Sequence, residues 1–214
     1  YIAVSAFYLT MLDGIKAAVA SGKTTQELNA ELSKEPGTPG FYLETNRAYR
    51  SEHDVFDDYS PAERSRLFGM PPATVWQNME NLRKYPEKTA VLKAGNVLRA
   101  ELIEAFAAGA LIRWRTELVN RIIPENLELV KTCICLHNER TGSDRDVYMW
   151  NQVHSLRLTL AKDTMDNKSL FTRIKNAVAD GDYDAASDLQ VEMAAAVNRL
   201  KNVYDEYRCN VIDE

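Results

Sequence analysis

The sequence predicts an all-α protein. Apolar residues recur at steps of three and four through nearly the whole chain, which is the spacing of one face of a helix. Helix-start signals such as Ser60-Pro61-Ala62-Glu63 and helix-ending glycines such as Gly22 and Gly181 alternate along it. No stretch shows a clean alternation of apolar and polar residues bounded by turns, so no strand is predicted. We expect an irregular helical array that ends in a helix hairpin or small bundle.

The first quarter of the chain predicts two helices and a long loop. An apolar stripe marks the first helix: Val4, Phe7, Tyr8, Met11, Leu12 and Ile15. Gly22 follows where a helix-ending glycine belongs. Thr24 and Glu27 have the spacing of a capping box, which predicts a short helix to about Leu32. The Pro- and Gly-rich run 34–40 and the polar, acidic run 49–59 indicate a surface loop.

Start and break signals divide the middle of the chain. In Ser60-Pro61-Ala62-Glu63 the serine caps, the proline takes the first helical position and the glutamate reaches back. The run 71–74 starts another helix, which Pro86 ends or turns, and Gly95 breaks the next turn. From Arg99 a long helix is predicted. Pro124 interrupts it, because proline lacks the N–H and its ring clashes with the preceding turn, so a kink or a new helix follows.

The last third has the pattern of a helix hairpin. Ser143 and Asp144 can cap a helix whose apolar positions recur to Leu160, and a short helix at 170–178 ends at Gly181. The final helix starts near Asp182. Its apolar stripe is continuous: Ala186, Leu189, Met193, Val197, Leu200 and Tyr204.

Composition and charge exclude several classes of protein. Apolar residues are 45% and charged residues 27% of the 214, which is typical of globular domains and not of disordered chains. The 26 basic residues are scattered among 31 acidic ones, so no nucleic-acid partner is expected. Three cysteines are too few for a disulfide scaffold. No uninterrupted apolar run approaches the roughly 20 residues of a membrane span, so we expect a cytoplasmic protein without a membrane partner.

The only cluster of soft metal ligands is Cys133-Ile134-Cys135-Leu136-His137. On a strand Cys133, Cys135 and His137 would share a face, whereas on a helix only Cys133 and His137 would. A structural zinc site needs four ligands, usually in two separated pairs. The other candidates, Cys209, His53 and His154, do not form a pair. Small core cysteines on a helix are therefore favoured over a metal site, and no metal ligand is assigned.

Two histidines and an acidic loop are also weak candidates. His154 lies between Val153 and Leu156 on a helix expected to face the core, so a packed or interface histidine is favoured over a catalytic base. His53 is expected to be solvated. The carboxylates of Asp54, Asp57 and Asp58 do not match the spacing of a calcium loop, so a solvated loop is favoured.

No catalytic motif is present. The sequence has no Gly-rich phosphate loop, no nucleophile elbow and no metalloprotease helix signature. Lys93-Ala94-Gly95-Asn96 has one glycine and no preceding strand, so it is interpreted as a turn. We therefore assign no catalytic, cofactor-binding or metal-binding residue, and expect that the chain lacks a complete active site.

Three stretches, in order, resemble the C-terminal part of glutamine synthetases. Residues 1–15 resemble the family's aromatic or Leu-rich helix that ends in Leu-Asp-Gly-Ile. Residues 58–63 followed by 72–79 resemble its acidic loop, short helix and barrel-packing helix. Residues 91–97 and 101–106 resemble the Gly turn before its long C-terminal helix.

The resemblance covers about residues 1–120, and 121–214 would be a helical C-terminal extension. It implies an ATP-dependent ligase that joins ammonia to glutamate with Mg²⁺ or Mn²⁺. The family's metal ligands and arginines map onto no residue of this chain, so the segment would be catalytically incomplete. The tyrosine that some relatives nucleotidylate aligns with Asp57, two places from Tyr59, so this mode of control is not expected.

Two hypotheses follow for the role of the chain. In the first, the chain is a fragment of a longer ligase, as its opening Tyr1-Ile2-Ala3-Val4 without Met also suggested, and it packs on the barrel and joins subunits into a homo-oligomer. Aromatic residues that could anchor subunit contacts, or instead pack an internal core, are Trp114, Trp150, Tyr204 and Tyr207. In the second, the chain is a stand-alone helical interaction or regulatory module.

Overall fold

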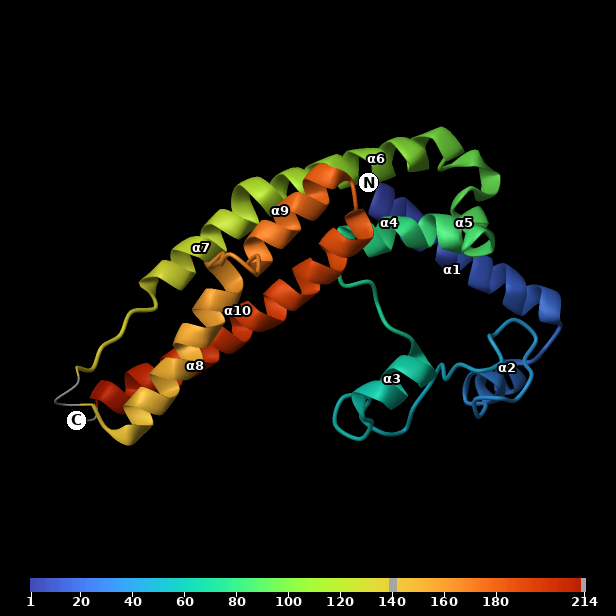
Figure 1. Cartoon of the computed structure of the whole chain (residues 1–214). Helices are drawn as coiled ribbons and strands as arrows, with labels where there is room; N and C mark the ends of the chain where they lie inside the picture. Colours follow the sequence, from blue (N-terminus) through green and yellow to red (C-terminus); the bar gives the residue numbers. More distant parts are fainter. Residues whose placement is uncertain (139–141, 213–214) are drawn as a thin grey trace. The chain divides into compact units, whose positions relative to one another are not determined.

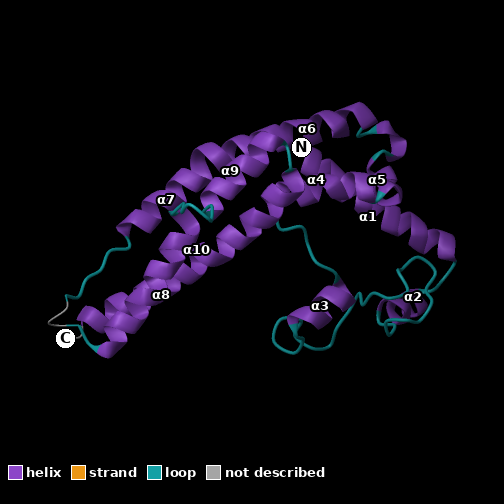
Figure 2. Ribbon diagram, in the orientation of Figure 1, coloured by secondary structure: helices purple, strands orange, loops and turns teal. Residues whose placement is uncertain are grey.

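The computed structural model describes residues 1–138 and 142–212, and these residues form helices and loops without a strand (Figures 1 and 2). The all-α prediction is therefore confirmed. The elements in chain order are α1 Ile2–Ser21, α2 Thr25–Leu32, α3 Pro61–Phe68, α4 Val75–Lys84, α5 Pro86–Leu92, the 3₁₀ turn η1 Ala94–Asn96, α6 Ala100–Glu117, the π turn η2 Leu118–Ile122, α7 Ile123–Thr132, α8 Asp144–Ala161, α9 Leu170–Asp180 and α10 Tyr183–Ile212.

The chain divides into two compact units. The first contains residues 1–72 and 81–104, and the second contains residues 73–80 and 105–214. The boundary at residue 120 came from the extent of the family resemblance, not from compactness. It stays a prediction. By compactness, residues 105–120 and the short segment 73–80 belong with the C-terminal helices.

The first unit has a small core. Leu9 of α1 packs with Leu98 and Ile103, and Leu82 and Leu92 cover part of this cluster. The predicted surface loop is present, since between α2 and α3 the chain forms turns and bends but no helix. Both predicted capping boxes are present: the Thr24 hydroxyl accepts from the Glu27 amide, and the Ser60 hydroxyl accepts from the Glu63 amide. Local sequence therefore sets where α2 and α3 begin.

The second unit has a larger core, built mainly by α8, α9 and α10, which lie side by side (Figure 1). The predicted stripe of α10 faces this core, and Leu200 on it is fully buried, as is Tyr207, three residues beyond the last predicted position. Ser143 caps α8, and Gly181 ends α9 in the left-handed conformation, at φ 76°. A helix hairpin with a third helix is thus confirmed for the C-terminal third.

A new helix, α7, begins at Pro124's position in the chain, which is one of the two outcomes predicted there. The chain passes from α6 through the π turn Leu118–Ile122 directly into α7, with Pro124 in the first turn of α7. The Ile123 amide bonds back to the Leu118 carbonyl, five residues earlier. The Asn126 side chain also donates to the Ile122 carbonyl at 2.9 Å. Proline has no N–H to donate to the carbonyl four residues earlier. The π turn accommodates this loss because its hydrogen bonds join residues five apart.

Candidate functional site

The Cys-Ile-Cys-Leu-His segment is neither a helix nor a metal cluster. Cys133 ends α7 and is buried, with its thiol toward the Leu129 carbonyl at 3.4 Å. Cys135 lies in the irregular segment that follows and is exposed. The expectation of core cysteines on a helix is therefore correct for burial at Cys133 and wrong for Cys135. Among the described residues no group of three or more His, Cys, Asp or Glu side chains comes close enough to hold a metal ion.

Two phenols of α10, those of Tyr207 and Tyr204, hold this segment to the helix. The Tyr207 hydroxyl, which is fully buried, accepts hydrogen bonds from the amides of Leu136 at 2.8 Å and His137 at 3.2 Å. His137 Nδ1 lies 2.7 Å from the same oxygen. The Cys135 thiol is 3.6 Å from the same hydroxyl, so two side chains as well as two amides gather around it. One turn earlier, the Tyr204 hydroxyl accepts from the Ile134 amide at 3.2 Å.

The electrostatics of this cluster favour anchoring over catalysis. The Cys135 thiol is 3.8 Å from His137 Nδ1, whereas the Tyr207 hydroxyl is closer to that nitrogen, at 2.7 Å. Burial raises the pKa of the Tyr207 phenol, so it stays protonated at neutral pH. Hydrogen bonds from the Ser143 side chain and backbone, and then from Asn210, hold the pKa of buried Asp146 below its usual value. The arrangement positions a loop and does not activate a nucleophile.

The structure also shows the burial of His154 and of the four aromatic residues that could anchor subunit contacts. His154 is exposed on α8, with its ring 6.0 Å from that of Trp150, so it is not packed in the core, and the alternative of an interface histidine stays a prediction. Trp114 and Tyr207 are buried, so they pack the internal core and are not free for subunit contacts. Trp150 and Tyr204 are half-buried beside that core.

The acidic loop is a solvated turn, as predicted. Asp54, Asp57 and Asp58 are exposed. The Asp54 carboxylate accepts the amides of Phe56 at 2.7 Å and Asp57 at 3.1 Å, and these bonds lower its pKa. His53 is exposed, and the Tyr59 hydroxyl pairs with Ser51 at 3.0 Å. The carboxylates therefore stabilise the turn itself and do not converge on a common point.

The most unusual surface is one side of α1. Its large apolar side chains are exposed by 44 to 77%, and we call them the α1 apolar face: Val4, Phe7, Tyr8, Met11, Leu12, Ile15 and Val19. They recur at steps of three and four, so they lie along one stripe. The opposite side of α1, at Leu9 and Ala6, packs in the core of the first unit. Contiguous exposed apolar stripes are typical of surfaces that contact another protein or a membrane.

The same helix meets the length and composition of a membrane span. Its mean hydropathy is 1.5 over an 18-residue window of which 6% is buried, and no other helix of the described residues qualifies. This differs from the expectation that no segment would do so, because α1 reaches the threshold despite Asp13 and Lys16. Length and composition alone do not separate a spanning helix from a helix that packs on another domain.

Sequence reasoning identified the residues of the α1 apolar face as one helical stripe, except Val19. It missed the anchoring role of Tyr207, for which the available signal was the spacing of Tyr204 and Tyr207 at the end of the α10 stripe. No family model, curated protein or solved structure matches the chain.

Proposed function

We propose that this chain is the helical C-terminal part of a glutamine-synthetase-like ligase, and that the α1 apolar face packs against the catalytic part of that enzyme. The observation that carries the proposal is that two features fall on the same residues. The first stretch that resembles the family, residues 1–15, is also the stretch whose apolar side chains are left uncovered.

The energetics of the α1 apolar face favour coverage. Burying a Leu, Ile, Val, Phe or Met side chain is worth about 1.5–3 kcal/mol relative to leaving it exposed. Met11, Leu12 and Ile15 lie in mid-helix, where the backbone is already ordered, so a partner gains this energy without first folding the segment. The Thr10 hydroxyl is bonded to the Phe7 carbonyl at 2.8 Å and so presents no unsatisfied polar group.

The proposed division of labour leaves the chemistry outside this chain. ATP, Mg²⁺ or Mn²⁺ and glutamate would bind to the preceding catalytic part of a cytoplasmic enzyme. This segment would cover that part and support the contacts of a homo-oligomer. The second unit suits a supporting role, because its buried polar groups are satisfied internally, as Trp114 Nε1 donating to Gln190 at 2.7 Å illustrates.

The first test is the intact mass of the product of the native gene. A subunit much longer than 214 residues, with ATP-dependent glutamine formation, is expected. The 214-residue chain purified alone should form no glutamine. A native product of this length, or ligase activity in the isolated chain, would contradict the proposal.

A stand-alone helical interaction module is the second candidate. The observation that favours it is the core of the second unit, whose buried residues, from Trp114 to Tyr207, all belong to that unit. Such a module needs no catalytic region before it. If the native product has this length and the protein is a stable monomer, the module becomes the better explanation.

A further inference from the structure

An apolar cavity of about 270 Å³ lies in the first unit, where α1, α2 and residues 41–43 meet. Its floor is formed by three small residues of α1: Gly14, Ala17 and Ala18. A Cβ placed on Gly14 would meet no atom within 4 Å, so the space above this position is open. The large side chains of the α1 apolar face therefore give way to small ones where the cavity lies.

Polar contacts hold the walls of the cavity in place and leave no free charge in it. The Glu31 carboxylate of α2 accepts a hydrogen bond from the Phe41 amide and pairs with Lys23. The Tyr42 hydroxyl donates to the Asp13 carboxylate of α1. Among the described residues that line the cavity, Glu31 is the one charged residue, and its charge is already neutralised.

The rest of the lining is apolar, and two aromatic rings at the rim are uncovered. Leu28 and Leu32 of α2 form one wall. On the other side the Phe41 and Tyr42 side chains are exposed by 58 and 55%. The Lys23 ammonium lies 5.7 Å from the centroid of the Phe41 ring and helps to hold the ring there. Covering a Phe side chain is worth about 1.5–3 kcal/mol, so the fixed rings favour an apolar ligand independently of the volume of the cavity.

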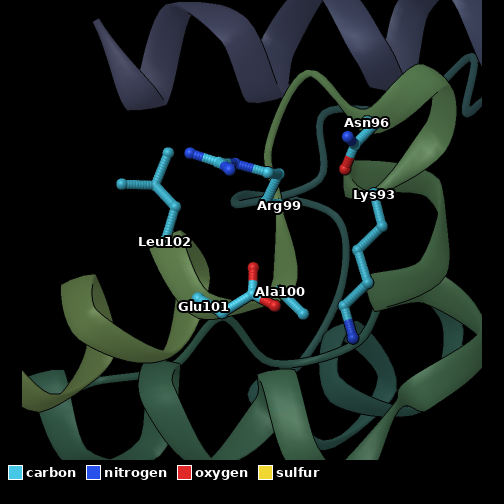
Figure 3. A pocket seen from close by; sticks show the side chains of 6 residues that line it. All are labelled: Lys93, Asn96, Arg99, Ala100, Glu101 and Leu102. Carbon is cyan, nitrogen blue, oxygen red and sulfur yellow. The ribbon is translucent and has the colours of Figure 1, made fainter.

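The larger space at the start of α6, of about 700 Å³, has none of these properties (Figure 3). Its lining comes from the single stretch 93–102. The charged groups of Lys93 and Arg99 point apart, with the Glu101 carboxylate between them (Figure 3). The walls of the apolar cavity, in contrast, come from three segments that hydrogen bonds tie together.

We propose that the apolar cavity binds a small, uncharged aromatic molecule of one or two rings. Its volume exceeds the roughly 150 Å³ of an engineered apolar cavity that binds benzene, and it is below the roughly 300–1,000 Å³ of pockets for drug-sized ligands. A charged ligand would lose its hydration and find no free opposite charge, because Glu31 is already paired. The short side chains of the floor and the rings at the rim suit a planar ring. The inference does not depend on the proposed ligase.

Titration with indole, followed by NMR of the isotope-labelled chain, tests the cavity. Saturable shifts are expected at Gly14, Ala17 and Ala18. Ala18→Leu should weaken indole binding about 10-fold or more, because the larger side chain occupies the space that the ring needs. The same variant should unfold at an equal or higher temperature, because it fills a cavity with a good helix former. Damage to the fold would lower the unfolding temperature instead.

Ala20→Leu is the matched control, since Ala20 is an exposed residue of α1 outside the lining, and it should leave indole binding unchanged. The Met11→Lys, Ile15→Glu double variant should also bind indole, because both changes fall on the α1 apolar face and not in the cavity. Three indoles of similar size test the charge. Neutral 3-methylindole should bind several-fold more tightly than the anion indole-3-acetate and the cation tryptamine.

Four results would overturn the proposal. The first is no indole binding at millimolar concentration, and the second is loss of binding in the Met11→Lys, Ile15→Glu variant, which would place indole on the α1 apolar face. The third is tighter binding of tryptamine than of 3-methylindole, which would show that Glu31 is free to pair with a ligand. The fourth is an Ala18→Leu variant that binds indole normally but self-associates less, because the cavity would then receive a side chain of another protein chain.

Discussion

The hydroxyl groups of Thr74 and Ser187, 113 residues apart in sequence, form a buried hydrogen bond of 2.7 Å. Thr74 also precedes α4, where its hydroxyl accepts from the Gln77 amide at 3.2 Å. Two residues later the Trp76 indole donates to Asp184 at 2.6 Å. These contacts attach the beginning of α4 to the beginning of α10 within the second unit, which is why the short segment 73–80 belongs to it.

Replacement of Ser187 by alanine should lower the free energy of unfolding by about 1–3 kcal/mol, because it leaves the buried Thr74 hydroxyl without its partner. Chemical denaturation measures the change. The double variant with Thr74→Val should show a coupling of about 1 kcal/mol in a double-mutant cycle. Ser155→Ala, at an exposed position of α8, is the control and should change stability by less than about 0.5 kcal/mol. Additive effects would argue that the bond does not form.

Replacement of Tyr207 by phenylalanine should release the segment that follows α7 while leaving the helices intact. Leu136 and His137 then lose the acceptor of their amides, and the expected cost is about 1–2 kcal/mol. Hydrogen exchange should show faster exchange at these two amides, with little change in α8 and α9. Tyr204→Phe should affect mainly Ile134. Unchanged exchange at Leu136 in Tyr207→Phe would show that the phenol does not anchor the segment.

Asp163 should make stability depend on pH in the acid range. Backbone and side-chain hydrogen bonds from Ser169 lower its pKa to about 2 from 3.8. Since the folded pKa is below the unfolded one, the carboxylate stabilises the fold above about pH 4, and this contribution disappears as pH falls toward 2. A chemical-shift titration of the Asp163 carboxyl should find this midpoint, and Ser169→Ala should raise it. A midpoint at or above 3.8 in the parent chain would refute the assignment.

The isolated chain should self-associate through the α1 apolar face. Sedimentation velocity should show a sedimentation coefficient that rises with protein concentration. The double variant Met11→Lys, Ile15→Glu should shift the protein toward monomer, because both charges fall on the exposed stripe. Val191→Lys, at a partly exposed apolar position of α10, is the control and should not do so. A monomer at all concentrations in the parent chain would favour the stand-alone module.

Most element boundaries were predictable because local chemistry sets them. Ser60, Thr24 and Ser143 cap helices through their own hydroxyl groups, and Gly22 and Gly181 end helices because they adopt positive φ. The outcome at Pro124 was not predictable in detail. Proline removes a donor, but whether the chain kinks or inserts a π turn depends on the partners that its neighbours find.

Periodicity determined which residues share a helix face, and it did so equally well for α1 and α10. It did not determine which face is covered. The stripe of α10 is buried by α8 and α9, whereas the stripe of α1 is exposed, although both obey the same spacing. Likewise, the cysteine pattern could not reveal that Tyr207 anchors His137 from 70 residues away. The helices, their caps and their apolar faces can be predicted from the sequence, because they depend on residues within a few turns of one another. Burial and long-range hydrogen bonding become visible in the folded chain alone, because both depend on which distant surfaces meet.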